Sequence, residues 1–114
     1  MKYLLLICED PSARPTDPAA QEAMTAEYGA FTENIAASGE LAGGERLHGV
    51  DSATSVRVNH GQLSVIDGPF AETKEHLGGF YLVDVADLDR AIELASRLPA
   101  ARTGVIEVRP VWEM

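Results

Sequence analysis

The chain has 114 residues, a mass of 12.2 kDa and a formal net charge of −9, with 46% apolar and 24% charged residues. This length supports a single domain over residues 1–114 and excludes a two-domain enzyme. The composition is that of a folded globular protein. The negative charge disfavours direct binding to nucleic acid or to an anionic membrane surface, because both repel an acidic protein.

The first eight residues form a short apolar run that Glu9 and Asp10 end. A run of this length neither spans a membrane nor forms the core of a signal peptide, so we expect a cytoplasmic protein. It is typical of a strand buried on both faces, which places residues 1–8 in the middle of a sheet. The single cysteine, Cys8, cannot form an intrachain disulfide and is interpreted as a small core residue.

A first helix is predicted over residues 18–38. Asp17 and Pro18 provide an N-cap and a first helical residue, and Gly39 provides the stop. The apolar stripe of this helix recurs every three or four residues and consists of Met24, Tyr28, Phe31 and Ile35. All charged residues between positions 15 and 45 are acidic, so the outer surface of the helix is either simply solvated or a docking face for a basic protein partner.

The middle of the chain is predicted to be rich in β-structure. Residues 40–47 form a short strand, and residues 55–58 and 63–66 form a hairpin around the turn at 59–62. Two further elements of β-structure follow, an interior strand over 79–85 and a closing strand over 105–112.

A second helix lies between these last two strands. Asp87 caps it and Pro99 ends it. Its expected apolar stripe consists of Leu88, Ala91, Ile92, Ala95 and Leu98.

This element order predicts an α+β fold: a ferredoxin-like antiparallel sheet with two helices on one face and an inserted β-hairpin. Two helices cover only one face of the sheet, whereas residues 3–7 and 80–85 are apolar on both. A bare apolar face would exceed the patch that monomers usually expose. We therefore expect a homodimer in which two sheets pack face to face.

Two adjoining stretches, 67–75 (DGPFAETKE) and 77–85 (LGGFYLVDV), closely resemble the DGPF branch of the YCII-related family. The match extends to the ending VRPVWEM, residues 108–114, and covers essentially the whole chain. The resemblance implies the dimeric α/β barrel superfamily with a ferredoxin-like protomer. Related proteins have been proposed as enzymes through a pair of His and Asp, with the His on helix 1; helix 1 here contains no histidine, so this pair is not carried over. Bacterial DGPF proteins are often encoded beside extracytoplasmic-function sigma factors, which implies a role in stress signalling.

Two residues are candidates for acid–base chemistry. Asp67 ends a predicted strand at a turn restrained by Pro69, and its carboxylate is either a general base or the cap of its own turn. His48 ends the second strand and could face Asp67 across the sheet, which would pair a base with an orienting carboxylate. The alternative interpretation of His48 is an ordinary surface histidine.

Four residues are candidates for contact with a ligand. Arg109 shares one face of the last strand with Glu107 and could hold a carboxylate through two parallel hydrogen bonds in a dimer cavity, or it could pair with Glu107. Glu72 and Lys74 form either a binding lip or a solvated loop. Tyr81 either packs in the sheet or reaches the cavity with its hydroxyl.

No spacing of His and Cys indicates a metal site, and no cofactor is expected. The sequence therefore favours a protein that binds a small anionic or carbonyl-containing molecule in a dimer cavity, with proton-transfer chemistry as an extension of that function. The alternative is a non-enzymatic regulatory module associated with a sigma-factor stress-response system.

Overall fold

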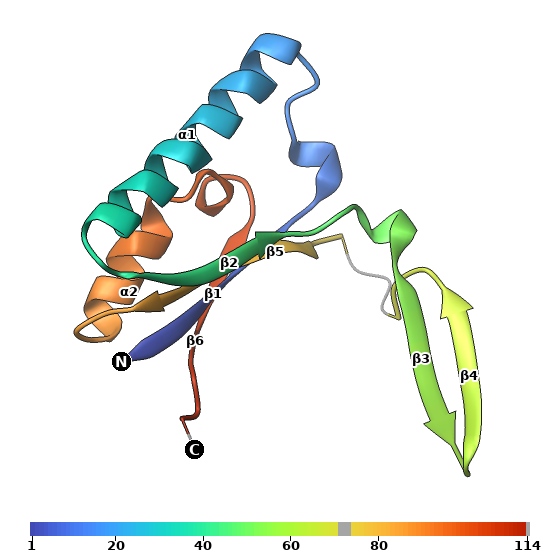
Figure 1. Cartoon of the computed structure of the whole chain (residues 1–114). Coiled ribbons are helices and arrows are strands. Elements are labelled where there is room, and N and C mark those ends of the chain that lie inside the picture. The colour runs from blue at the N-terminus through green and yellow to red at the C-terminus, as the bar shows by residue number, and fades with distance from the viewer. Residues whose placement is uncertain (71–73, 114) are drawn as a thin grey trace.

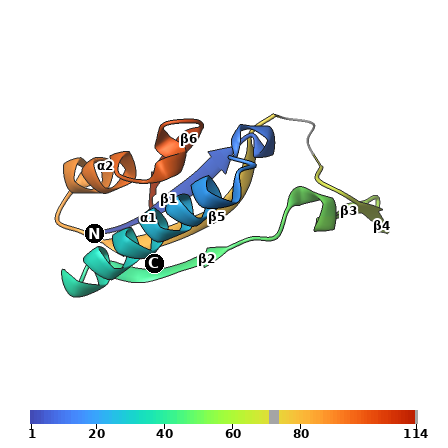
Figure 2. The ribbon, with the colours of Figure 1, turned by 90° about the horizontal axis from the view of Figure 1, so that it is seen from above.

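A computed structural model of the chain describes residues 1–70 and 74–113. Four antiparallel strands form one sheet in the order β2-β5-β1-β6, and two helices pack on one of its faces (Figures 1 and 2). The strands of this sheet are β1 (Lys2–Glu9), β2 (Leu41–Arg46), β5 (His76–Asp84) and β6 (Val105–Pro110). This α+β architecture confirms the predicted ferredoxin-like fold.

The central strand is β1, which pairs with β5 on one side and with β6 on the other. Its side chains alternate between the two faces of the sheet. Tyr3, Leu5 and Ile7 are buried under the helices, whereas Leu4 and Leu6 are half-buried on the opposite, helix-free face. The interior strand predicted from the first apolar run is therefore confirmed.

The first helix, α1 (Pro18–Ala37), lies across the sheet in Figure 2. Its N-cap is Asp17, whose carboxylate accepts a hydrogen bond from the Ala20 amide at 3.2 Å. Gly39 follows the helix with a φ of +79°, a conformation that glycine adopts without strain. Phe31 and Ile35 bury the predicted apolar stripe in the core.

The second helix is α2 (Leu88–Ser96), and Asp87 caps it as predicted, accepting the Arg90 amide at 2.9 Å. Its apolar stripe needs correction, because Leu88 and Ile92 are about half exposed. Ile92 lies about 100° around the helix from the buried Ala91, since each residue turns the helix by that angle. The residues that face the sheet follow the spacing i, i+3, i+4, i+7 and are Ala91, Leu94, Ala95 and Leu98.

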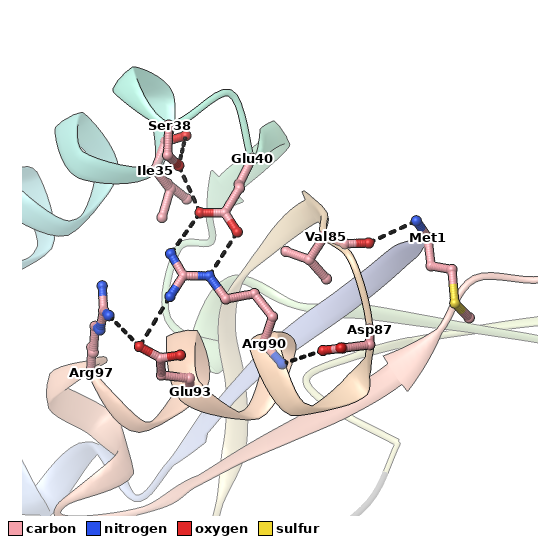
Figure 3. Close-up of polar contacts among 9 residues, drawn as sticks. All are labelled: Met1, Ile35, Ser38, Glu40, Val85, Asp87, Arg90, Glu93 and Arg97. Carbon is pink, nitrogen blue, oxygen red and sulfur yellow. Dashed lines mark hydrogen bonds and ion pairs between the residues drawn. The ribbon is translucent and has the colours of Figure 1, made fainter.

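A polar cluster ties the end of α1 to α2 (Figure 3). Arg90 donates from Nε and Nη2 to the two carboxylate oxygens of Glu40, each at 2.8 Å, and the Ser38 hydroxyl donates to the same carboxylate at 2.7 Å. These hydrogen bonds, from Arg90 first and then Ser38, lower the pKa of Glu40 to about 2. The contact between the helix ends therefore depends on an ionised Glu40.

The inserted hairpin consists of β3 (Thr54–Asn59) and β4 (Gln62–Asp67), which form a separate two-stranded sheet. The turn residues His60 and Gly61 have φ values of 50° and 75°, as the favoured two-residue hairpin turn requires. Figure 1 shows the hairpin projecting from one end of the four-stranded sheet, away from α1. The predicted hairpin is confirmed, and it lies outside the helix-covered body of the molecule.

Candidate functional site

A cavity of about 720 Å³ lies between α1 and the part of the sheet formed by β2 and β5. This volume falls in the range of small-molecule binding sites. The helix contributes Gln21, Met24, Thr25, Tyr28 and Thr32 to its lining. The cavity belongs to a single chain, and a further cavity between two copies stays a prediction.

Arg14 lies in this cavity with its guanidinium held by Glu9. Glu9 ends β1, is only 6% exposed, and accepts hydrogen bonds on one oxygen, Oε1, from Arg14 Nε at 2.7 Å and Nη2 at 2.6 Å. Both contacts use the same edge of the planar guanidinium. Nη1 makes no hydrogen bond within residues 1–70 and 74–113. The opposite edge of Arg14 is therefore available to a second carboxylate, in the bidentate geometry that arginine favours.

Gly78 makes room for this guanidinium. A Cβ at position 78 would lie 3.1 Å from Arg14 Nη2, so any side chain there would push the guanidinium away from the sheet. The neighbouring Gly79 has a different role, because a Cβ there would lie 2.8 Å from the backbone carbonyl oxygen of Glu45. Gly79 therefore permits the close pairing of β2 with β5, while Gly78 permits the position of Arg14.

Arg46 adds positive charge to the same cavity. It ends β2 opposite Gly79 and is exposed, and it forms no ion pair with the part of the chain that the structure describes. Glu9 pairs with Arg14, and Glu45 also belongs to the lining, so two arginines and two glutamates leave the lining without net charge. An anion that enters would be attracted to Arg46 and oriented by Arg14.

Four residues with hydroxyl groups line the cavity, Thr25, Tyr28, Thr32 and Tyr81, and the Thr25 hydroxyl donates to the Gln21 carbonyl oxygen. Thr32 Oγ1 bonds to the Tyr28 carbonyl oxygen at 2.8 Å and to the Tyr81 hydroxyl at 2.7 Å. Because a hydroxyl has one proton and Thr32 donates it to the carbonyl, Tyr81 donates to Thr32 and keeps its own lone pairs for a ligand. Burial, and then the negative charge of Glu9, raise the pKa of the Tyr28 hydroxyl, which is therefore neutral at pH 7.

Of the predicted ligand contacts, Tyr81 lines the cavity and Arg109 does not. Arg109 lies on β6 opposite Leu4, on the helix-free face of the sheet, with Glu107 opposite Leu6 on that same face. The structure shows no ion pair between Arg109 and Glu107. A role of Arg109 toward a ligand between two copies stays a prediction.

The predicted acid–base residues lie outside the cavity. Asp67 ends β4, opposite Thr54, and is exposed, whereas His48 lies in the loop after β2. They do not face each other across one sheet, because β2 pairs with β5 and β4 pairs with β3. The Asp67 carboxylate makes no hydrogen bond within the described ranges, so a catalytic role and a capping role both stay predictions. Lys74 is exposed just before β5, and Glu72 lies outside the described residues.

Cys8 lies half-buried on the helix-free face, opposite Leu77 and Val105. Burial raises the pKa of its thiol, and the nearby carboxylates of Glu107 and Glu75 raise it further. A protonated thiol is a weak nucleophile, which agrees with its interpretation as a packing residue.

The pair of Glu9 and Arg14 is the part of the site that sequence reasoning missed. The alternation of side chains along β1 could have revealed this pair. Glu9 falls on the same face of the strand as the buried residues Tyr3, Leu5 and Ile7. A carboxylate on a buried face needs a cationic partner. Arg14, five residues later, is the first arginine that follows it in the chain.

In the part of the chain that the structure describes, no group of three or more His, Cys, Asp or Glu side chains is arranged to hold a metal ion. Nor does any helix in that part have the length and apolar composition needed to cross a membrane.

Comparison with known proteins matches the YCII-related domain to residues 1–114. The chain belongs to the YCII-related family. An uncharacterised protein of Rhizobium meliloti (strain 1021) is 38% identical over 114 residues, which cover 97% of this chain and 92% of the relative. The family predicted from residues 67–85 is thus confirmed, and membership of its DGPF branch stays a prediction.

Proposed function

We propose that this YCII-related protein binds a small organic carboxylate in the cavity between α1 and the β2–β5 part of the sheet. The observation that carries the proposal is the Arg14 guanidinium, which Glu9 holds along one edge while Nη1 is left unbonded in a cavity of about 720 Å³. An arginine oriented in this way is suited to a planar anion. The family relationship is compatible with this function and assigns no ligand of its own.

The surroundings of Arg14 favour a small and partly apolar ligand. The Arg46 guanidinium, which forms no ion pair with the described part of the chain, gives the cavity a second cationic group. The neutral Tyr28 hydroxyl and the acceptor lone pairs of Tyr81 suit a carbonyl or hydroxyl group next to the carboxylate. Met24 provides an apolar wall. A 2-oxo or 2-hydroxy carboxylate combines these features.

The test is a calorimetric titration of the purified protein with a panel of small carboxylates, including pyruvate, lactate and malonate. Arg14→Gln removes the guanidinium and should weaken binding about 10- to 100-fold, because hydrogen bonds to charged groups contribute about 1.5–3 kcal/mol. Arg14→Lys should weaken it nearly as much, because lysine keeps the charge but loses the planar double contact.

Two other arginines serve as controls in the same titration. Arg102 pairs with Glu27 on the exposed surface, so Arg102→Gln should leave affinity unchanged. Arg109→Lys tests the site predicted on the helix-free face. If a carboxylate binds Arg14→Gln as tightly as the wild type, and binding is lost in Arg109→Lys, the cavity at α1 is not the ligand site.

Proton transfer by Asp67 would extend this function, and its test is the change Asp67→Asn in an assay of any carboxylate that binds. Because Asp67 lies on the hairpin, a base at that position would need a ligand bound outside the cavity. Loss of turnover with unchanged affinity would support a catalytic Asp67.

A non-enzymatic regulatory module in a sigma-factor system is the second candidate function. One observation favours it: α1 exposes Glu22, Glu27 and Glu33 and contains no basic residue. Such a face would attract a basic protein segment by electrostatic steering. Replacement of Glu22 and Glu33 by Gln should then abolish salt-sensitive binding to a lysine-rich peptide, while Arg14→Gln should leave that binding unchanged.

A further inference from the structure

The Glu9 carboxylate is bound differently from two other carboxylates that pair with arginine. Glu40 accepts Arg90 on both of its oxygens, Nε on Oε2 and Nη2 on Oε1, each at 2.8 Å. Glu27 likewise uses both oxygens toward Arg102, each at 3.1 Å. Glu9 instead receives its arginine on Oε1 alone. Because a carboxylate can accept hydrogen bonds on both oxygens, this one-sided contact leaves Oε2 of Glu9 with unused lone pairs.

The second oxygen of Glu9 opens into the cavity beneath α1. Oε2 makes no hydrogen bond within residues 1–70 and 74–113. In the same ranges, no side-chain nitrogen or oxygen that lacks a hydrogen bond is sealed from solvent inside the protein. Oε2 therefore touches open space, although Glu9 as a whole is only 6% exposed. Since Glu9 lines the cavity of about 720 Å³, this is the space that its oxygen reaches.

Two hydrogen-bond donors border the same space as this acceptor. Nη1 of Arg14 is unbonded in the part of the chain that the structure describes. The Tyr28 hydroxyl lines the cavity too, and after burial the charge of Glu9 is the second cause that raises its pKa, so the two groups are close. One cavity thus holds a carboxylate base, a cationic anchor and a neutral hydroxyl donor, which together can move a proton and stabilise the charge that develops.

We propose that Oε2 of Glu9 is a base that removes a proton from C3 of a 2-oxo carboxylate, so that the protein catalyses enolisation of this ligand. The inference rests on the proposed function, because Arg14 has to hold the carboxylate of the ligand. It also narrows that function, since only a 2-oxo acid with a hydrogen on C3 can react.

The step is balanced without any further reactant. The C3–H bond breaks and its proton forms a bond with Oε2 of Glu9. The electron pair of that bond forms a C2=C3 double bond, and the π pair of the C2 carbonyl moves to its oxygen, which accepts a hydrogen bond from Tyr28. Return of a proton from Glu9 to C3 restores the ketone. In heavy water the proton on Glu9 exchanges with solvent, so the returned atom is deuterium.

The experiment follows 2-oxobutanoate by proton NMR in heavy water with the full chain. This acid has two hydrogens on C3, and a base fixed in a cavity reaches only one of them. The wild type should exchange one of the two at least 100-fold faster than buffer alone, which is the lower range of catalysis by a positioned base. Lactate should bind and keep its C2 hydrogen, because no carbonyl group makes that hydrogen acidic.

Two variants test Glu9 and a third is the control. Glu9→Gln removes the charge but keeps an oxygen that can accept from Arg14, so exchange should fall at least 100-fold while calorimetric affinity for 2-oxobutanoate changes by less than about threefold. Glu9→Asp keeps the charge and withdraws it by one methylene group, so exchange should fall about 10-fold. Glu27→Gln removes a carboxylate that pairs with Arg102 on the surface and should leave exchange unchanged.

The outcomes separate this inference from the function on which it rests. Binding of 2-oxobutanoate without exchange above that of buffer would overturn the inference and leave the carboxylate site standing. Failure of both 2-oxobutanoate and lactate to bind would remove both. Equal exchange of the two C3 hydrogens, or exchange that persists in Glu9→Gln and is lost in Asp67→Asn, would show that Glu9 is not the base. If circular dichroism shows that Glu9→Gln is unfolded, Glu9→Asp decides, and an unchanged rate in that variant would overturn the inference.

Discussion

The helix-covered body and the hairpin are both built from strands that alternate between two faces, and they differ in what covers the apolar one. In β1 the inward residue Leu5 is fully buried beneath the helices. In β3 the equivalent residue, Val58, is 68% exposed. The period of a strand therefore shows which side chains share a face, whereas the covering element has to come from elsewhere in the chain or from another molecule.

The largest contrast should appear when one leucine is truncated in each region. Leu94 on α2 is fully buried, so Leu94→Ala should lower the free energy of unfolding by about 3 kcal/mol through lost burial and the cavity left behind. Leu63→Ala should change it by less than about 0.5 kcal/mol at concentrations where the protein is monomeric. Urea unfolding checks both. An equal loss in the two variants under these conditions would show that the hairpin belongs to the folding core of the monomer.

The next largest effect on stability should come from replacing Gly79 by Ala, and Gly29 provides a control in the same helix-covered body. Gly79→Ala forces a Cβ against the Glu45 carbonyl oxygen, and it should cost about 2 kcal/mol because backbone must move. Gly29 is the matched control, since it lies on α1 with open space around its missing Cβ. Gly29→Ala should stabilise the protein by about 0.5–1 kcal/mol through higher helix propensity. Thermal unfolding of both variants should therefore show shifts of opposite sign.

The stability of the helix-covered body should decrease in acid, because the contact between Glu40 and Arg90 requires an ionised Glu40. Because folding lowers the pKa of Glu40 from 4.5 to about 2, its contribution to stability is complete above about pH 4.5 and is lost as the pH falls toward 2. Glu40→Gln should reduce stability by about 1 kcal/mol at pH 7 and should flatten the decline of stability below pH 4.5. Glu22→Gln on the exposed surface of α1 is the control. If the stability of Glu40→Gln declined below pH 4.5 as steeply as that of the wild type, the prediction would be contradicted.

Much of the fold could be predicted from the sequence, because the decisive signals are local. Asp17 and Asp87 capped the two helices where expected, and the turn at His60 and Gly61 set the hairpin. The stripe of α2 was predicted wrongly at Leu88 and Ile92, because apolar residues lie on more than one side of this short helix. Only the packing against the sheet selects between them.

The site was harder to predict, because it depends on which distant strands become neighbours. Tyr81 was predicted either to pack in the sheet or to reach a cavity between two copies; in the structure it packs edge-on against Phe31 and lines the cavity within one chain. Arg14 was missed because its importance comes from the buried Glu9 and from the space above Gly78, neither of which a short motif records. The motif that identified the family covers residues 67–85, and its second half contributes Gly78, Gly79 and Tyr81 to the cavity, whereas Arg14 lies outside the motif.

The smallest effect on stability is expected at Gly78, next to the structural Gly79. The Cβ of Gly78→Ala would meet only the mobile end of Arg14, at 3.1 Å from Nη2, so the guanidinium can move aside and the free energy of unfolding should change by less than about 0.5 kcal/mol. The same movement tilts the free edge of Arg14, and carboxylate binding should weaken about fivefold because bidentate hydrogen bonds depend on geometry. Calorimetric titration and urea unfolding of the one variant measure the two quantities. Unchanged affinity with reduced stability would show that Gly78, like Gly79, serves the sheet and not the site.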